Sequence, residues 1–204
     1  MHTTTRNHAL VLLIVLTCVP LYSAAKRCSE PTWEQLRDHF GLEPHPEGGF
    51  FVETYLANGS IPVSVLPDHF ADSPDTRPYS TAIYYLLRAG PAYDDRSHFH
   101  MLAMDEVWHF YLGGQLTIVL LHPADGSVEV VKLGRNVLHD ETVQFVVPAQ
   151  TWFGAFASGG NYAFIGNTNA PGFVYQDWQL GNKTALLEEF PDAADWIEML
   201  ALAE

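Results

Sequence analysis

Positive charge is scarce in this sequence. Its 204 residues include 10 lysines and arginines against 24 aspartates and glutamates, which gives a net charge of −14 at pH 7. An acidic surface repels the phosphates of nucleic acids and of anionic lipids. The composition therefore argues against nucleic acid and anionic membranes as partners, and it identifies no positive partner.

Cysteine is nearly absent, with only Cys18 and Cys28 in the whole chain. Because Cys18 lies in an N-terminal segment that we expect to be removed, Cys28 has no intramolecular disulfide partner. Stability must then come from a hydrophobic core, and 48% of the residues are hydrophobic and 13% aromatic. A chain of this length is sufficient for one domain with a sizeable core.

The sequence also lacks an apolar run long enough to span a bilayer comfortably. The run Ala9–Val19 follows Arg6, and small residues stand at 23–25. A basic residue, a short apolar run and a small-residue cleavage site are typical of a secretory signal peptide. We predict that residues 1–25 are a cleaved signal, that 26–204 form one secreted domain, and that the protein makes no stable membrane insertion.

Short stretches of alternating or branched apolar residues, separated by glycine and proline, dominate the remaining chain. About ten such stretches at close spacing are typical of an antiparallel sandwich or barrel. Helical spacing occurs only near the ends, at 30–40 and at 183–200, where Pro191 interrupts it. Residues 57–77, rich in proline, aspartate and serine, predict a long surface loop. The sequence thus predicts an all-β protein with short flanking helices.

The stretch 97–119 carries the side chains best suited to chemistry. His98 and His100 are two residues apart, so in a regular strand both imidazoles would point to the same face. A turn follows, and Glu106, Trp108 and Phe110 would share one face of the next strand. Two histidines and a carboxylate on neighbouring strands of a barrel predict either a metal site or an acid–base site.

Several blocks of the sequence, taken in order, resemble an uncharacterised "domain of unknown function" family of the cupins. They are HPEGGFFVETY, STAIYYLL, DEVWHFYLGG, VVPAQTWFGAF and APGFVYQDWQLGNKTALLEEFP, and the likeness covers residues 39–200. The resemblance implies the double-stranded β-helix, an RmlC-like jelly-roll barrel with a pocket at its mouth, and commonly a homodimer. Relatives by fold include epimerases, storage proteins and dioxygenases, so the resemblance implies a fold and leaves the activity open.

Two cupin motifs are recognisable, both in altered form. The first normally runs His-x-His, a glutamate and a glycine, and His98, His100, Glu106 and Gly113 match it with one extra residue before the glutamate. In the second motif a histidine is expected where this chain has Phe153. The resemblance therefore implies that the usual fourth metal ligand is absent.

The leading hypothesis is a small-molecule pocket, with carbohydrates as a candidate ligand class and isomerase- or epimerase-like chemistry. His100 would act as the base, oriented by a carboxylate such as Glu106, and a tyrosine such as Tyr84 or Tyr111 would act as the acid. The acidic composition counts against a nucleotide-sugar substrate, whose diphosphate needs basic side chains.

Two alternatives remain open from the sequence. The first is a metal-dependent, dioxygenase-like cupin in which His98, His100 and Glu106 hold a divalent metal. The second is a non-catalytic binding or storage protein whose ligand stacks on aromatic side chains. The residues expected to bind the small-molecule ligand, beyond those already named as catalytic, are Glu47, Glu53, Tyr55, His98, Trp108, Phe110 and Trp152. His45 was assigned to a turn, and Asp177 is a weaker candidate.

Overall fold

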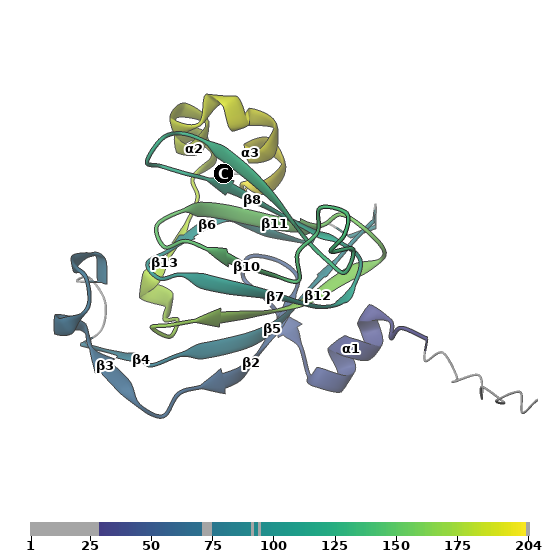
Figure 1. Cartoon of the computed structure of the whole chain (residues 1–204), viewed down its shortest axis with the longest axis horizontal. Coiled ribbons are helices and arrows are strands. Elements are labelled where there is room, and N and C mark those ends of the chain that lie inside the picture. The colour runs from purple at the N-terminus through teal and green to yellow at the C-terminus, as the bar shows by residue number, and fades with distance from the viewer. Residues whose placement is uncertain (1–28, 71–74, 91, 94, 203–204) are drawn as a thin grey trace, which may run out of the picture.

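The computed structural model describes residues 29–70, 75–90, 92–93 and 95–202 (Figure 1). The predicted signal peptide at 1–25, together with Cys18 and Cys28, lies outside the described residues. Among the described residues, no helix has both the length and the apolar character needed to cross a membrane.

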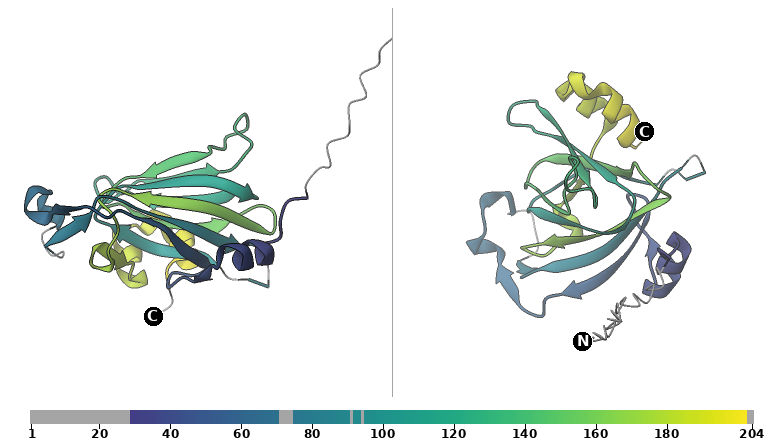
Figure 2. Two further views of the ribbon diagram at one scale, coloured as in Figure 1. Left: turned by 90° about the horizontal axis from the view of Figure 1, so that it is seen from below. Right: turned by 45° about the vertical axis from the view of Figure 1, so that its right-hand side comes forward.

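Two antiparallel sheets face each other and form the barrel (Figures 1 and 2). The strands of the six-stranded sheet, in spatial order, are β1 (Glu43–Pro44), β2 (Phe50–Leu56), β5 (Thr81–Arg88), β12 (Tyr162–Asn169), β7 (Glu106–Gly113) and β10 (Gln144–Val147). Those of the five-stranded sheet are β13 (Trp178–Leu180), β6 (Arg96–Leu102), β11 (Trp152–Ala157), β8 (Leu116–Leu121) and β9 (Val128–Leu133).

The space between the sheets is filled by apolar side chains, as the alternating pattern requires. Strand β8, which lies between β11 and β9, is buried at all six positions, and Trp108 and Phe153 are each 1% exposed. The predicted all-β jelly roll with short flanking helices is confirmed.

Helix α1 (Trp33–Phe40) begins at a capping box formed by Thr32 and Gln35 and ends at Gly41, whose φ of 64° is left-handed. Its Leu36 packs on the outer face of the six-stranded sheet. The predicted N-terminal helix is therefore present, beginning at Trp33.

The C-terminal segment forms two short helices, α2 (Lys183–Glu189) and α3 (Ala194–Leu200), and Pro191 begins the 3-10 turn η4 (Pro191–Ala193) between them. Both helices cover the outer face of the five-stranded sheet (Figure 1). Ile197 and Leu200 of α3 are fully buried there. This position holds helix α3 against the back of strand β6, where the Leu200 carbonyl lies 3.0 Å from Nδ1 of His98.

The segment predicted as a surface loop has more structure than expected. It contains the strand pair β3 (Ser60–Pro62) and β4 (Thr76–Pro78) and the 3-10 turns η1 (Val63–Val65) and η2 (Asp68–Phe70). Arg77 is fully buried and pairs with Asp177 of the turn η3 (Tyr175–Asp177). The buried ion pair attaches this hairpin to the segment that leads into β13.

Candidate functional site

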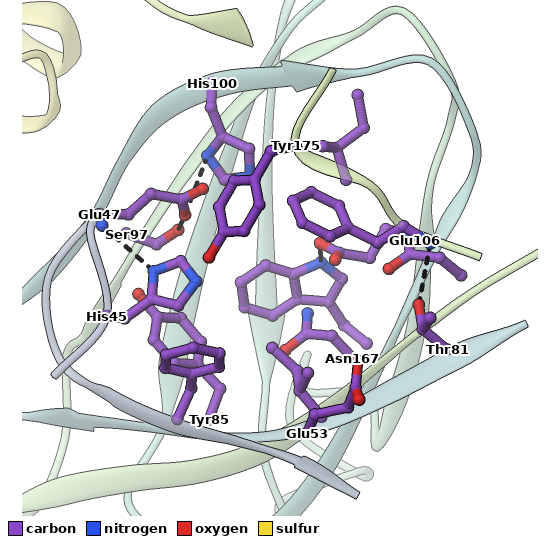
Figure 3. A pocket seen from close by; sticks show the side chains of 16 residues that line it. His45, Glu47, Glu53, Thr81, Tyr85, Ser97, His100, Glu106, Asn167 and Tyr175 are labelled. Carbon is purple, nitrogen blue, oxygen red and sulfur yellow. Dashed lines mark hydrogen bonds and ion pairs between the residues drawn. The ribbon is translucent and has the colours of Figure 1, made fainter. Parts of the chain in front are cut away.

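A cavity of about 140 Å³ opens between the two sheets (Figure 3). It is smaller than the roughly 300–1,000 Å³ typical of pockets for drug-sized ligands, so it suits a small molecule. Its lining consists of His45, Glu47, Phe51, Glu53, Thr81, Ile83, Tyr85, Ser97, His100, Leu102, Glu106, Trp108, Asn167, Asn169, Phe173 and Tyr175.

Rows of paired residues across the six-stranded sheet form one wall of the cavity. Because opposite residues of antiparallel strands share a face, strand pairing decides which side chains lie beside one another. One row runs from Glu106 through Asn169 to Thr81. The next runs from Trp108 through Asn167 and Ile83 to Glu53.

The turn before β2 brings Glu47 and His45 to the cavity. Gly48 and Gly49 both have positive φ values, 108° and 73°. A Cβ on Gly48 would lie 2.4 Å from the Arg96 carbonyl oxygen, so the backbone comes close to β6 there. The glycine pair is therefore what allows this turn to fold over the barrel mouth.

A β-bulge in β6 separates the two histidines of the first motif. Strand β11 pairs Phe153 with His100 and Ala155 with Ser97, so one residue of β11 stands opposite two of β6. Ser97 and His100 consequently both line the cavity. The ring of His98 instead lies outside it, with Nδ1 3.0 Å from the Leu200 carbonyl oxygen. The expected shared orientation of His98 and His100 is not what the structure has.

Three side chains contact the carboxylate of Glu47. Its Oε1 accepts a hydrogen bond from the indole N–H of Trp178, and its Oε2 accepts one from the Ser97 hydroxyl at 3.0 Å. The same Oε2 lies 3.3 Å from Nδ1 of His100. Glu47 is thus the carboxylate that contacts His100, a role that the sequence had suggested for Glu106.

The two cavity histidines hold their protons on different nitrogens. Nδ1 of His100 lies 2.7 Å from the carbonyl oxygen of His98, which can only accept, so this nitrogen carries the hydrogen. In the neutral imidazole, Nε2 of His100 then presents a lone pair, and it has no protein partner among the described residues. Nδ1 of His45 accepts the Glu47 backbone N–H at 3.1 Å, so the hydrogen of neutral His45 sits on Nε2. Burial lowers the pKa of His45, which favours that neutral form.

Glu106 has the most perturbed carboxyl group of the cavity. Burial, followed by repulsion from the charge of Glu47, raises the pKa of Glu106 to about 8. The indole of Trp108 opposes the shift by donating a hydrogen bond to Oε2 at 2.7 Å. At neutral pH the Glu106 carboxyl therefore keeps its proton and can act as an acid.

The predicted site residues divide into two groups. Those that line the cavity are Glu47, Glu53, His100, Glu106 and Trp108. The others, described next, lie on the outside of the barrel or in its packed core.

Tyr84 lies on the outer face of the six-stranded sheet, where its ring centroid is 5.0 Å from that of Phe40 in α1 and 5.8 Å from that of Tyr111. The neighbouring Tyr85 points inward, and its hydroxyl donates a hydrogen bond to the Gly48 carbonyl at 2.7 Å. Neither Tyr84 nor Tyr111 therefore faces the cavity.

Three predicted aromatic contacts also lie elsewhere. Tyr55 follows an irregularity in the pairing of β2 and is 54% exposed. Phe110 packs against the barrel core. Trp152 packs beneath α2 and α3 with Phe99. Strand irregularity explains Tyr55 alone, since the pairing of β2 shifts between Glu53 and Tyr55. Phe110 keeps the inward face of Trp108 but packs in the core.

Several residues of the cavity are not predicted by the sequence pattern. His45 lies in the predicted turn, and this turn reaches the cavity. Asn167 and Asn169 lie on β12, more than 50 residues after Glu106 and Trp108, their pairing partners on β7. A pair of asparagines alternating in an otherwise apolar strand was the available signal.

The predicted metal ligands do not come together. His98 faces Leu200 outside the cavity, while His100 and Glu106 line it. Phe153, where the second cupin motif carries a histidine, has its ring centroid 4.0 Å from that of His100. Across the described residues, no group of three or more histidine, cysteine, aspartate or glutamate side chains is arranged to hold a metal ion. The donor set does not fit a divalent metal.

The double-stranded β-helix, with its cavity at the barrel mouth, is the cupin architecture. The family model described as "Cupin superfamily (DUF985)" matches residues 34–181, and the chain belongs to this family.

Similar proteins match this chain over most of their length. The uncharacterised protein YML079W of Saccharomyces cerevisiae is 29% identical over 150 residues, which are 71% of this chain and 72% of the yeast protein. The structure of protein SO0799 from Shewanella oneidensis has a TM-score of 0.73 at 30% identity and covers 85% of this chain and 99% of its own. The structure of a hypothetical protein from Leishmania major has a TM-score of 0.72 at 25% identity, and the match covers 85% of this chain and 100% of the Leishmania protein.

Proposed function

We propose that this cupin binds a small polar molecule, with carbohydrates as the first candidates, and moves a proton on it by acid–base catalysis. The proposal rests on one observation: a proton acceptor and a proton donor line the same cavity. The neutral tautomer of His100 presents a lone pair on Nε2, while the raised pKa of Glu106 keeps a proton on its carboxyl at neutral pH. Figure 3 shows these two side chains on different sides of the cavity.

The chemistry that suits this pair is isomerisation or epimerisation next to a carbonyl group. Nε2 of His100 takes a proton from the carbon beside the carbonyl, and Glu106 gives its proton to the carbonyl oxygen, which yields an enediol. The imidazolium then gives a proton to the other carbon, or to the other face of the same carbon, and the Glu106 carboxylate takes back the proton of the enediol hydroxyl that becomes the carbonyl. Both side chains return to their starting states, and no redox partner is needed. Glu47 stabilises the imidazolium that forms, because its Oε2 lies 3.3 Å from Nδ1.

The test is deuterium incorporation from heavy water. The protein is incubated with a set of aldoses and ketoses in D2O, and exchange at carbon is followed by NMR. We expect exchange into at least one sugar, with a loss of about 100-fold or more in His100→Gln, since general acid–base groups typically contribute about 10² to 10⁴. Glu106→Gln keeps a polar group of the same shape and should lose activity similarly.

The matched control is His122→Gln, because His122 lies outside the cavity and contacts Glu129 on an exposed hairpin. It should exchange like the wild type. Binding of a sugar without any exchange would contradict the catalytic proposal and leave a non-catalytic binding protein. Exchange that survives in His100→Gln would contradict the role of His100.

We also propose that residues 26–204 form one domain, that the protein is secreted after cleavage of residues 1–25, and that it assembles as a homodimer. The support is the signal-like order of residues at the N-terminus and the resemblance to dimeric cupins. N-terminal sequencing of exported protein should begin at Lys26, and light scattering should give twice the chain mass. An uncleaved N-terminus or a monomer mass would contradict the respective proposal.

A further inference from the structure

The lining of the cavity carries negative charge and no permanently positive side chain. Glu47 and Glu53 supply the carboxylates, since Glu106 keeps its proton at neutral pH, and the described residues of the lining include no lysine or arginine. Of the two cavity histidines, His45 is disfavoured as a cation because burial lowers its pKa, and His100 faces Glu47, whose Oε2 lies 3.3 Å from its Nδ1, so neither histidine compensates Glu53. An anionic ligand would therefore meet uncompensated repulsion from the cavity wall.

A buried side chain without a partner points to a ligand in this cavity. Asn167 is 3% exposed and lines the cavity near the Glu106 carboxyl, whose pKa it lowers, yet neither Nδ2 nor Oδ1 of its amide makes a hydrogen bond of normal geometry with a described residue. Leaving a buried polar group unpaired lowers the stability of the folded protein. The Asn167 amide therefore offers its Nδ2 as a donor and its Oδ1 as an acceptor to a bound molecule.

Strand pairing places Asn167 in one row with a free carboxylate. Asn167 on β12 and Glu53 on β2 both pair with Ile83 of the strand between them. Since neighbouring strands lie about 4.8 Å apart, the backbones of Asn167 and Glu53 are separated by roughly 10 Å. Glu53 is exposed and makes no hydrogen bond or ion pair with any described residue. The row therefore ends in a carboxylate that is available to a ligand at the open side of the cavity.

Aromatic side chains complete the lining beside this row. Phe51 precedes Glu53 by two residues on the same strand, Trp108 is the pairing partner of Asn167, and Tyr175 is 59% exposed. Aromatic faces attract cations through their quadrupole, and they also pack against the carbon skeleton of a sugar. Carboxylates and aromatic faces together are the environment in which proteins bind organic cations.

We propose that the molecule bound here carries a protonated amino group, held by Glu53, while its neutral polar part meets Asn167. If the proposed sugar chemistry holds, on which this identification rests, the substrate class is the amino sugars. The amine occupies the open side of the row, and the reacting carbons lie deeper, towards His100 and Glu106.

The experiment compares matched ligands that differ in charge. Glucosamine, galactosamine and mannosamine, their neutral parents, and glucuronate and galacturonate are titrated into the protein by calorimetry. At least one amino sugar should bind about tenfold more tightly than its neutral parent, a difference of about 1.4 kcal/mol, and the uronates should bind most weakly. In Glu53→Gln the amino sugar should fall to the affinity of its parent, which itself should stay within about twofold.

The control variant is Glu188→Gln, which removes the same charge from the exposed face of α2. It should leave the preference for amines intact. The inference is overturned if no amino sugar binds better than its parent, if a uronate binds as well, or if Glu53→Gln keeps the preference. If amino sugars bind more tightly than their parents but no deuterium is exchanged, only the proposed catalysis is contradicted. If neutral sugars exchange deuterium but amino sugars do not bind more tightly, only this inference is contradicted.

Discussion

The proton on Glu106 links the stability of the protein to pH. An unfolded chain ionises this carboxyl near its usual pKa of 4.5, whereas the folded chain holds the proton up to about 8. Between these values the folded state binds more protons, so the free energy of unfolding falls as pH rises, by at most about 1.4 kcal/mol per pH unit from this group.

Replacing Glu106 by glutamine should remove that dependence, because glutamine stays neutral at every pH. We expect Glu106→Gln to gain stability relative to wild type between pH 5 and pH 8, which are about the limits of this window. Urea denaturation of both proteins across this range measures the difference. Parallel stability curves would contradict the raised pKa.

The hydrogen bonds of the two cavity histidines predict opposite neutral tautomers. His100 should carry its hydrogen on Nδ1 and His45 on Nε2. Nitrogen-15 NMR of labelled imidazoles distinguishes the two forms, with His100→Gln and His45→Gln used for assignment. An Nε2 hydrogen on neutral His100 would leave no lone pair for the proposed base and would contradict its role.

Because the amide of Asn167 is unpaired, its replacement should affect the stability of the protein and its affinity for ligand differently. Asn167→Leu keeps a similar shape and removes the buried polar atoms, so its stability should equal or exceed that of the wild type. Ligand affinity should fall by about tenfold, since the ligand loses a donor and an acceptor. Thermal denaturation and calorimetry measure the two effects, and a destabilised variant with unchanged affinity would contradict this assignment.

At the scale of the element, the turn between β1 and β2 is the part of the fold that depends most on glycine. Gly49 and Gly126 have nearly the same φ, 73° and 72°. A Cβ on Gly49 would lie 2.5 Å from the Leu86 carbonyl oxygen, whereas one on Gly126 would have nothing within 4 Å. Alanine substitutions at Gly49 and Gly126 therefore distinguish the stability cost of backbone strain from that of steric conflict.

Gly126→Ala should cost about 1–2 kcal/mol of stability, the usual cost of a left-handed conformation. Gly49→Ala should cost about 3 kcal/mol or more, because the backbone of β5 must move as well. The turn would then displace His45 and Glu47 from the cavity. Chemical denaturation of both variants gives the comparison, and equal losses would contradict the close approach.

The β-bulge in β6 explains why alternation failed for His98. Regular spacing predicts a shared face for residues two apart, and a bulge of one residue inverts that rule between Ser97 and His100. The shape of the bulge depends on pairing with β11, where Gly154 lies opposite it with little room for a side chain. Nothing within the sequence of β6 itself reveals that pairing.

At the scale of the whole molecule, the sequence predicts the fold far better than the site. The order of short strands, the terminal helices and the family-like blocks lead to the cupin barrel, because each is a local pattern. Glu106 and Trp108 could be predicted as inward-facing because β7 is regular up to Phe110. Asn167 could not be placed beside Glu53, because their proximity comes from strands that are more than 100 residues apart in sequence.

The most direct test of the acid–base account is the titration of the Glu106 carboxyl by carbon-13 NMR, with Glu106→Gln identifying its signal. The account requires a proton donor in the cavity at neutral pH, opposite the lone pair of His100. It predicts a midpoint near pH 8. A midpoint near 4.5, the usual value for glutamate, would mean that Glu106 is ionised at neutral pH and would contradict the proposed mechanism.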